Sequence, residues 1–198
     1  VGALFGLSPD SKINPFICGD VEGFRNILEE FHKTKSFGEI KTKEQACELA
    51  KSQAKIMKEL GFTINFSPIV ESRNNVWPGR SFTGTLEEIK VKIIYYIRGL
   101  QENGIIATAK HYPGGSMIED PHIQTYKTEI YKEDLELFDV AINEKVKAIM
   151  VGHPIVFGAI NSFGRPSSLS KEVISHLRKS FFGLIITDSI DMEGIRKF

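Results

Sequence analysis

The chain has 198 residues, and 41% of them are apolar, so it can fold around one sizeable core. Its 25 basic residues equal its 25 acidic residues, and this zero net charge offers no field for attracting nucleic acid or an anionic membrane surface. No apolar run is long enough to span a bilayer, which excludes a transmembrane helix.

Two smaller features bear on the compartment. The opening segment Val1–Leu7 lacks the basic residues that begin a signal peptide, which favours a cytoplasmic location without fixing the compartment. Cys18 and Cys47 lie in apolar patterns, and we expect buried free thiols rather than a disulfide or a metal site.

Short apolar runs recur along the chain, each rich in Ile, Val or Phe and bounded by Gly, Pro or polar residues. Runs of this kind are typical of buried parallel strands. The six runs, in chain order, are Ala3–Leu7, Pro15–Gly19, Thr63–Val70, Gly104–Ala109, Lys147–Gly152 and Gly183–Thr187.

Between these runs, apolar residues recur with a period near 3.6, which predicts amphipathic helices. The first helix is expected over Lys43–Leu60. A second is opened by the capping box Thr85-Leu-Glu-Glu88 and stopped by Gly104. A third covers Lys132–Lys145, and a fourth is capped by Ser170. Strands alternating with helices predict an α/β fold built from right-handed βαβ units.

Ionisable residues come at or just after the end of five consecutive predicted strands. In an α/β barrel the functional site is built at this end of the strands. We therefore interpret these residues as parts of one shared site. They are Asp20, Glu22, Arg25, Glu71, Arg73, Lys110, His111, His153 and Asp188.

Several motifs resemble those of glycoside hydrolase family 3. Lys110-His-Tyr-Pro-Gly-Gly115, followed by Asp120-Pro-His122, is similar to the Lys-His-Phe-Pro-Gly and Asp-x-His signature of the NagZ-like β-N-acetylglucosaminidase branch. Four further segments match family motifs in the same order along the chain. They are Gly19-Asp-Val-Glu-Gly-Phe-Arg25, Asn65-Phe-Ser-Pro-Ile-Val70, Gly79-Arg-Ser-Phe82, and the stretch from Pro166-Ser-Ser-Leu-Ser170 to Thr187-Asp-Ser-Ile-Asp-Met192.

This resemblance implies a TIM-type (β/α) barrel that carries a retaining, two-step glycosidase. By the motif match, Asp188 is the nucleophile that attacks the anomeric carbon. His122 is the acid/base, and Asp120 orients its ring. We expect an extended Asp120-Pro-His122 segment, because a period of two puts both side chains on one side. Read without the family, Asp188 could instead cap the next helix.

The resemblance also assigns sugar-binding roles, and it implies neither a cofactor nor a metal. The implied substrate is a small saccharide derived from chitin or peptidoglycan, bound by Asp20, Arg25, Arg80, Lys110 and His111. His153 follows a strand and could line the pocket, or it could be a core histidine. Trp77 could stack on a sugar ring.

The chain departs from the family pattern in two motifs and in length. Phe24 stands where the first motif has a glycine, and Gly114-Gly-Ser-Met117 replaces Gly-His-Gly-Asp. The six predicted strands compare with eight in the family barrel. We therefore expect residues 1–198 to form a single barrel domain that is truncated at its C-terminus.

Three alternatives remain open from the sequence. A phosphorylase of the same family would use phosphate in place of water, since a histidine acid/base repels phosphate less than a carboxylate does. A non-catalytic sugar-binding derivative would fit the shortened loop. A metal-dependent barrel hydrolase would draw its ligands from His111, Asp120, His122, His153 and Asp188.

Overall fold

A computed structural model describes residues 15–22, 27–30, 32–71, 76–115, 119–120 and 122–198. Five strands form one sheet in the same order as they follow along the chain, and every neighbouring pair is parallel. Parallel neighbours need a crossover between them, and helices supply it. The strands are β1 (Cys18–Gly19), β2 (Ile64–Asn65), β3 (Ile106–Tyr112), β5 (Ala148–Val151) and β7 (Leu184–Thr187).

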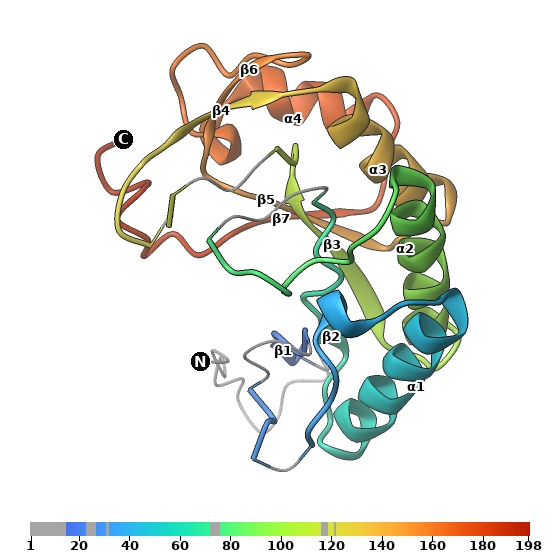
Figure 1. Ribbon diagram of the computed structural model, residues 1–198. Helices are drawn as coiled ribbons and strands as arrows, with labels where there is room; N and C mark the ends of the chain where they lie inside the picture. The colour runs from blue at the N-terminus through green and yellow to red at the C-terminus, as the bar shows by residue number, and fades with distance from the viewer. Residues whose placement is uncertain (1–14, 23–26, 31, 72–75, 116–118, 121) are drawn as a thin grey trace.

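The helices lie on the outer side of this curved sheet, and α1, α2 and α3 stand in a row along it (Figure 1). The arrangement is a half-barrel of parallel strands, as expected for an incomplete TIM-type barrel. The helical elements are η1 (Phe37–Glu39), α1 (Lys43–Glu59), α2 (Leu86–Gln101), α3 (Lys132–Asn143), η2 (Ser167–Leu169) and α4 (Lys171–Arg178).

The helix starts follow the local rules that the sequence indicated. At α2, the Glu88 backbone N–H donates to the Thr85 hydroxyl at 3.3 Å, and the Thr85 N–H donates to the Glu88 carboxylate at 2.7 Å. The expected capping box is therefore confirmed. At α4, the Ser170 hydroxyl accepts from the Val173 N–H at 3.4 Å, which is a weaker version of the same cap.

The helices α1 and α2 pack closely, and a glycine marks their nearest approach. A Cβ added to Gly99 of α2 would lie 2.7 Å from the Cβ of Ala50 and 2.9 Å from the carbonyl oxygen of Cys47, both on α1. Atoms cannot approach this closely without displacement, so a side chain at position 99 would push the two helices apart.

A buried polar network crosses the core from these helices to the sheet. The Tyr96 hydroxyl of α2 accepts from the Ser67 hydroxyl at 2.8 Å and donates to the Gln53 side chain of α1. Asn65 of β2 accepts from the Val21 N–H at 3.0 Å and donates to the Val21 carbonyl at 3.1 Å. Since Val21 lies between Asp20 and Glu22, this network fixes the backbone that carries both carboxylates.

The strand bounds differ from the sequence prediction. The strand β3 continues to Tyr112 and thus contains Lys110 and His111, which we had placed after its end. The strands β1 and β2 have two residues each, far shorter than the predicted runs. Parallel pairing to the next strand, rather than apolar content, sets these bounds.

One pair of strands was missed entirely. The strands β4 (Lys127–Ile130) and β6 (Ile155–Gly158) form a separate two-stranded parallel sheet. Half of β4 is exposed, so it lacks the continuous apolar run that indicates a buried strand. The predicted run Ala3–Leu7 lies outside the described residues, so the expected count of six barrel strands stays a prediction.

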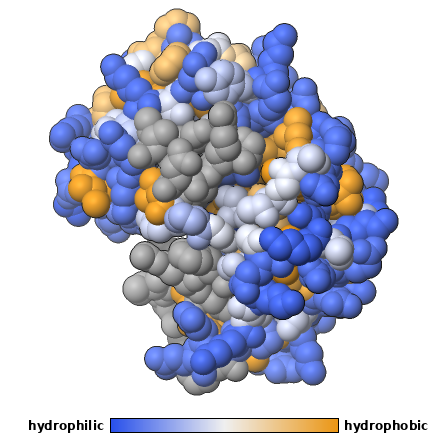
Figure 2. Space-filling view, in the orientation of Figure 1, coloured by the Kyte–Doolittle hydropathy of each residue, from blue (hydrophilic) through white to orange (hydrophobic). Residues whose placement is uncertain are grey.

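The remaining observations concern the surface, the two cysteines and the length of the helices. On the face in Figure 2, hydrophilic residues predominate among those described, and apolar groups are scattered in small patches. Cys18 and Cys47 are free, as expected, but half-buried rather than buried. No helix in the described ranges is long and apolar enough to cross a membrane.

Candidate active site

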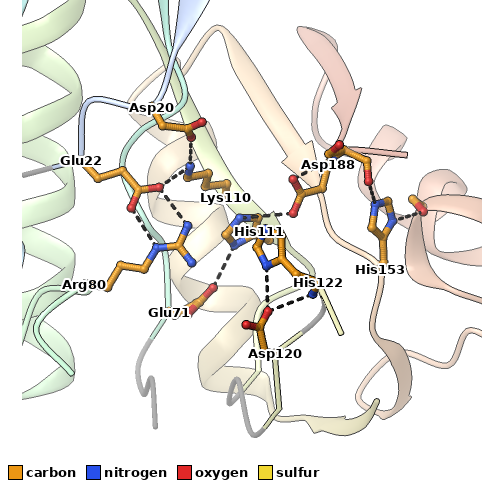
Figure 3. A network of polar contacts seen from close by, with 12 residues as sticks. Asp20, Glu22, Glu71, Arg80, Lys110, His111, Asp120, His122, His153 and Asp188 are labelled. Atoms are coloured by element: carbon orange, nitrogen blue, oxygen red, sulfur yellow. Dashed lines mark hydrogen bonds and ion pairs between the residues drawn. The ribbon is translucent and has the colours of Figure 1, made fainter. Parts of the chain in front are cut away.

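The carboxyl ends of the parallel strands meet at one edge of the half-barrel, and polar side chains converge there (Figure 3). Lys110 and His111, at the end of β3, are central to this convergence. The register between β3 and β5 shifts between Lys110 and Tyr112, which leaves His111 as an extra, bulged residue. A bulge re-aims a side chain, and here both Lys110 and His111 contact residues of the site.

Lys110 and Arg80 are paired with two carboxylates in a mostly buried cluster. The Lys110 ammonium lies 2.5 Å from an oxygen of Asp20 and also contacts Glu22. Arg80 holds Glu22 with two bonds, Nε to Oε2 at 2.8 Å and Nη2 to Oε1 at 3.0 Å. The side chains of Lys110 and Glu22 are only 2% and 4% exposed, whereas that of Asp20 is 50% exposed. Asp20 is therefore the most exposed member of the cluster.

Burial and pairing act in opposite directions on the pKa values of this cluster. Burial would raise the pKa of Glu22, but Lys110 and Arg80 outweigh it and hold that pKa below its ordinary value. Burial would lower the pKa of Lys110, but Glu22 and Asp20 raise it instead. Glu22 and Lys110 thus both stay charged at neutral pH.

His111 stands between two carboxylates. Its Nδ1 lies 3.1 Å from an oxygen of Glu71, and its Nε2 lies 3.6 Å from Oδ2 of Asp188. Burial, together with the nearby cations Arg80 and Lys110, lowers the pKa of His111 well below its ordinary value. The imidazole is therefore neutral at physiological pH.

Asp188 has one oxygen bound and one facing the site. Its Oδ1 accepts from the Ser189 backbone N–H at 2.8 Å, and its Oδ2 is the oxygen beside His111. The following peptide is held by His153, whose Nε2 lies 2.9 Å from the Ser189 carbonyl and whose Nδ1 lies 2.7 Å from the Ser168 hydroxyl. Both ring nitrogens of His153 are thus bonded within the protein.

Asp120 and His122 form the second carboxylate–imidazole pair. Asp120 Oδ1 accepts from His122 Nδ1 at 2.7 Å and from the His122 backbone N–H at 2.9 Å. We had expected an extended segment, and this expectation was wrong. The N–H of Ile123 donates to the carbonyl of Asp120 and closes a turn. The turn is favoured by the Asp120 side chain, which bonds the backbone two residues on.

Contacts through Trp77 link this pair to the buried cluster. The rings of His122 and Trp77 meet edge to face with centroids 6.0 Å apart, and the guanidinium of Arg80 lies 4.8 Å from the centre of the Trp77 ring. Trp77 thus contacts both Arg80 and His122. Its suggested stacking on a sugar remains a prediction.

A small pocket lies at the centre of these groups. It is lined by Glu71, His111, Gly114, Gly115, Tyr126, Gly152, His153, Pro154 and Asp188. The lining combines two imidazoles, two carboxylates, a tyrosine and three glycines, a polar set suited to hydroxyl groups.

The structure places most of the predicted site residues in this network. Asp20, Arg80, Lys110, His111 and Asp188 are joined through it, His153 lines the pocket, and Arg25 lies outside the described residues. Glu22 and Glu71 were noted at strand ends but given no role, although each makes a central contact. In the sequence, only their positions directly after Val21 and Val70, near the ends of predicted strands, indicated that they could belong to the site.

The described residues offer no group of three or more His, Cys, Asp or Glu arranged to hold a metal ion. The metal-dependent alternative therefore gains no support from them.

A curved parallel sheet with charged and imidazole groups at its carboxyl edge defines the class of α/β-barrel proteins with a polar site. Within that class, the chain belongs to the family of the glycosyl hydrolase family 3 N-terminal domain, whose sequence model matches residues 13–198. The fold is thus the TIM-like α/β fold of this family.

The chain is similar to proteins of this family in sequence and structure. It is 28% identical over 189 residues to a β-hexosaminidase of Psychromonas ingrahamii, which covers 89% of this chain but 56% of that relative. The crystal structure of a family 3 glycosyl hydrolase from Mycobacterium smegmatis superposes with a TM-score of 0.81 at 28% identity, covering 92% of this chain and 61% of that one. A family 3 β-N-acetylglucosaminidase from a Paenibacillus species gives a TM-score of 0.73 at 30% identity, covering 82% of this chain and 33% of that one.

Proposed function

We propose that the protein is a retaining glycoside hydrolase that removes terminal β-linked N-acetylglucosamine from saccharides derived from chitin or peptidoglycan. The chain spans 56% of the length of the first relative, so this activity is proposed for the protein to which the described half-barrel belongs. The names of the relatives, β-hexosaminidase and β-N-acetylglucosaminidase, support the substrate class.

The observation that carries the proposal is the state of Asp188. A nucleophilic carboxylate must be ionised and must keep one oxygen free to attack. In Asp188, the Ser189 N–H holds Oδ1 at 2.8 Å, and Oδ2 lies in the pocket beside a neutral imidazole at 3.6 Å. This geometry leaves Oδ2 as the attacking atom for the anomeric carbon.

His122 is the proposed acid/base, with Asp120 as its orienting carboxylate. Asp120 occupies Nδ1 at 2.7 Å, and among the described residues no protein group is bonded to Nε2. This nitrogen is therefore the one that donates a proton to the leaving oxygen and then takes one from water. The His122 side chain is 57% exposed, which gives the leaving group and the water access to it.

The remaining groups are proposed to hold the sugar. Asp20 and Lys110 can exchange hydrogen bonds with hydroxyl groups, and Arg80 can add a donor from the same cluster. Arg25 and His153 are proposed neighbours of the sugar, His153 through the ring that lines the pocket.

The test is hydrolysis of an aryl β-N-acetylglucosaminide by Asp188→Ala. We expect kcat to fall by about 1000-fold or more, because the covalent intermediate cannot form. Asp191→Ala is the matched control, since it removes an exposed carboxylate from the same segment and should leave kcat near that of the wild type. Retained hydrolysis in Asp188→Ala would refute the assignment.

The same assay separates hydrolysis from phosphorolysis. Free N-acetylglucosamine in the presence of added phosphate supports the hydrolase, whereas accumulation of a sugar 1-phosphate would assign the protein as a phosphorylase.

A further inference from the structure

The neutral ring of His111 has one N–H and two carboxylate neighbours. Its Nδ1 is 3.1 Å from Glu71 and its Nε2 is 3.6 Å from Asp188, on opposite sides of the ring (Figure 3). The three side chains are 11%, 4% and 16% exposed in the order His111, Glu71 and Asp188, so bulk water does not screen these contacts.

A neutral imidazole carries one N–H and one lone pair, so it cannot donate to both carboxylates. The 3.1 Å contact to Glu71 is within hydrogen-bond range, whereas the 3.6 Å separation from Asp188 is not. The nearby Arg80 cation attracts the carboxylate of Glu71 and favours its ionised form. An ionised carboxylate only accepts, so the contact to Glu71 requires the proton on Nδ1. The lone pair of Nε2 is then directed toward Asp188.

We infer that Glu71 is a positioning residue that fixes His111 in the tautomer with Nδ1 protonated, which keeps the Nε2 side free of a proton beside Asp188. This inference rests on the proposed role of Asp188 as the nucleophile. The opposite tautomer would direct an N–H at Oδ2, and a charge-assisted hydrogen bond there would reduce the electron density of the attacking oxygen.

The tautomer also sets what the pocket recognises. With a lone pair on Nε2 and a carboxylate oxygen 3.6 Å away, both sides of this gap accept hydrogen bonds. A sugar group that contacts Nε2 of His111 and Oδ2 of Asp188 must therefore be a donor, such as a hydroxyl or an amide N–H. A fluorine or an ether oxygen at that position of the sugar would find no partner.

Glu71→Gln tests the inference because glutamine has nearly the same shape but can donate. Its amide can turn its N–H toward Nδ1, which permits the Nε2–H tautomer that a carboxylate excludes. Glu71→Asp is the conservative control, since it keeps an acceptor-only group that requires the same tautomer as Glu71.

The decisive readout is the ¹⁵N spectrum of the histidine rings in the full chain, which distinguishes protonated from unprotonated ring nitrogens. The chain has five histidines, and the signals of His111 are assigned by their loss in His111→Gln. We expect the wild type and Glu71→Asp to carry the proton on Nδ1, and Glu71→Gln to move it at least partly to Nε2.

The kinetic readout accompanies the spectrum. In Glu71→Gln we expect kcat for the aryl glycoside to fall by about 10- to 100-fold, as when the carboxylate that orients a functional imidazole is removed. Glu71→Asp should recover most of the kcat.

Two results would overturn the inference: a wild-type His111 with its proton on Nε2, or an unchanged tautomer in a folded Glu71→Gln. If Glu71→Gln does not fold, the wild-type spectrum alone decides. The spectrum does not depend on turnover, so failure of the proposed function, seen as retained hydrolysis in Asp188→Ala, is distinguishable from failure of this inference.

Discussion

A single buried imidazole links the site to the stability of the protein. The folded chain holds His111 neutral, because burial and the cations Arg80 and Lys110 lower its pKa well below the ordinary value. The unfolded chain exposes the same ring to water, where it takes a second proton near pH 6.5. The two states therefore bind different numbers of protons in mildly acidic solution.

The sign of this difference predicts a pH dependence. Below about pH 6.5 the unfolded state binds the extra proton, so the contribution of neutral His111 to stability is complete above that pH and is lost as the pH falls below it. We expect the Tm of the wild type to decrease from pH 6.5 to pH 5, and His111→Gln to lose less over this interval. Thermal unfolding followed by circular dichroism measures both. His32→Gln, which removes a histidine bonded to Ser52 of α1, is the control for loss of an imidazole elsewhere in the chain. An identical pH profile for His111→Gln would contradict the assignment.

Candidate site residues could be predicted where they lie in a short sequence motif. They could not be predicted where their role depends on a partner distant in the sequence. Lys110, His111, Asp120 and His122 were found because they lie within a few positions of one another. The role of Glu22 depends on Arg80, which is 58 positions away along the chain. No local spacing in the sequence indicates such a pair, because the two residues come together only when the chain folds.

At the scale of secondary structure elements, the buried network around Tyr96 joins α1 and α2 to β2. Its hydroxyl contacts three side chains, Gln53 of α1 and, in and just after β2, Asn65 and Ser67. Burial raises the pKa of Tyr96, so the hydroxyl stays protonated and donates to Gln53. Removing it leaves partners that are sealed from water.

Tyr96→Phe should therefore destabilise the fold by about 1–3 kcal/mol, the cost of leaving a buried polar group without its hydrogen bond. Chemical denaturation gives this value directly. Tyr95→Phe is the matched control, because it removes a hydroxyl from the neighbouring, half-buried tyrosine of the same helix, and its effect should stay within about 0.5 kcal/mol. Equal losses in the two variants would show that the network does not stabilise the packing.

Helices were predicted closely and strands were not, for a physical reason. The bounds of α1 and α2 follow from caps and apolar periodicity, which act within four residues. A strand is defined by its partner in another part of the chain. The strands β4 and β6 pair with each other in a sheet separate from the main one, and the four residues of β4 alternate between exposed and buried.

At the scale of the whole molecule, alternation of strands and helices was sufficient to predict a parallel sheet with ionisable side chains gathered at the carboxyl ends of its strands. The charged cluster at that edge connects three successive βα units. Glu22 follows β1, Arg80 precedes α2 and Lys110 lies near the end of β3, so their contacts hold together segments that the sheet hydrogen bonds only partly join. The number of strands and the residues of the cluster depend on which strands pair in the folded sheet. A local sequence pattern does not determine that pairing.

Two arginine–glutamate pairs have the same two-bond geometry but differ in burial. Comparing them shows how burial changes the contribution of such a pair to the free energy of unfolding. Arg80 and Glu22 are 15% and 4% exposed, whereas Arg98 and Glu144, which join α2 to the end of α3, are 46% and 18% exposed. In the buried pair, Glu22→Gln keeps the side-chain volume but leaves Arg80 and Lys110 facing a neutral amide in a site with little water. We expect a loss of about 3–5 kcal/mol in the free energy of unfolding.

Glu144→Gln makes the same chemical change where water screens the partner, so its loss should stay below about 1 kcal/mol. Urea unfolding of the two variants and the wild type at one pH and one salt concentration gives the comparison. Added salt should reduce the small effect of Glu144→Gln further and leave that of Glu22→Gln nearly unchanged, because mobile ions reach only the exposed pair. Equal losses would mean that the cluster positions ligand-binding groups without holding the half-barrel together.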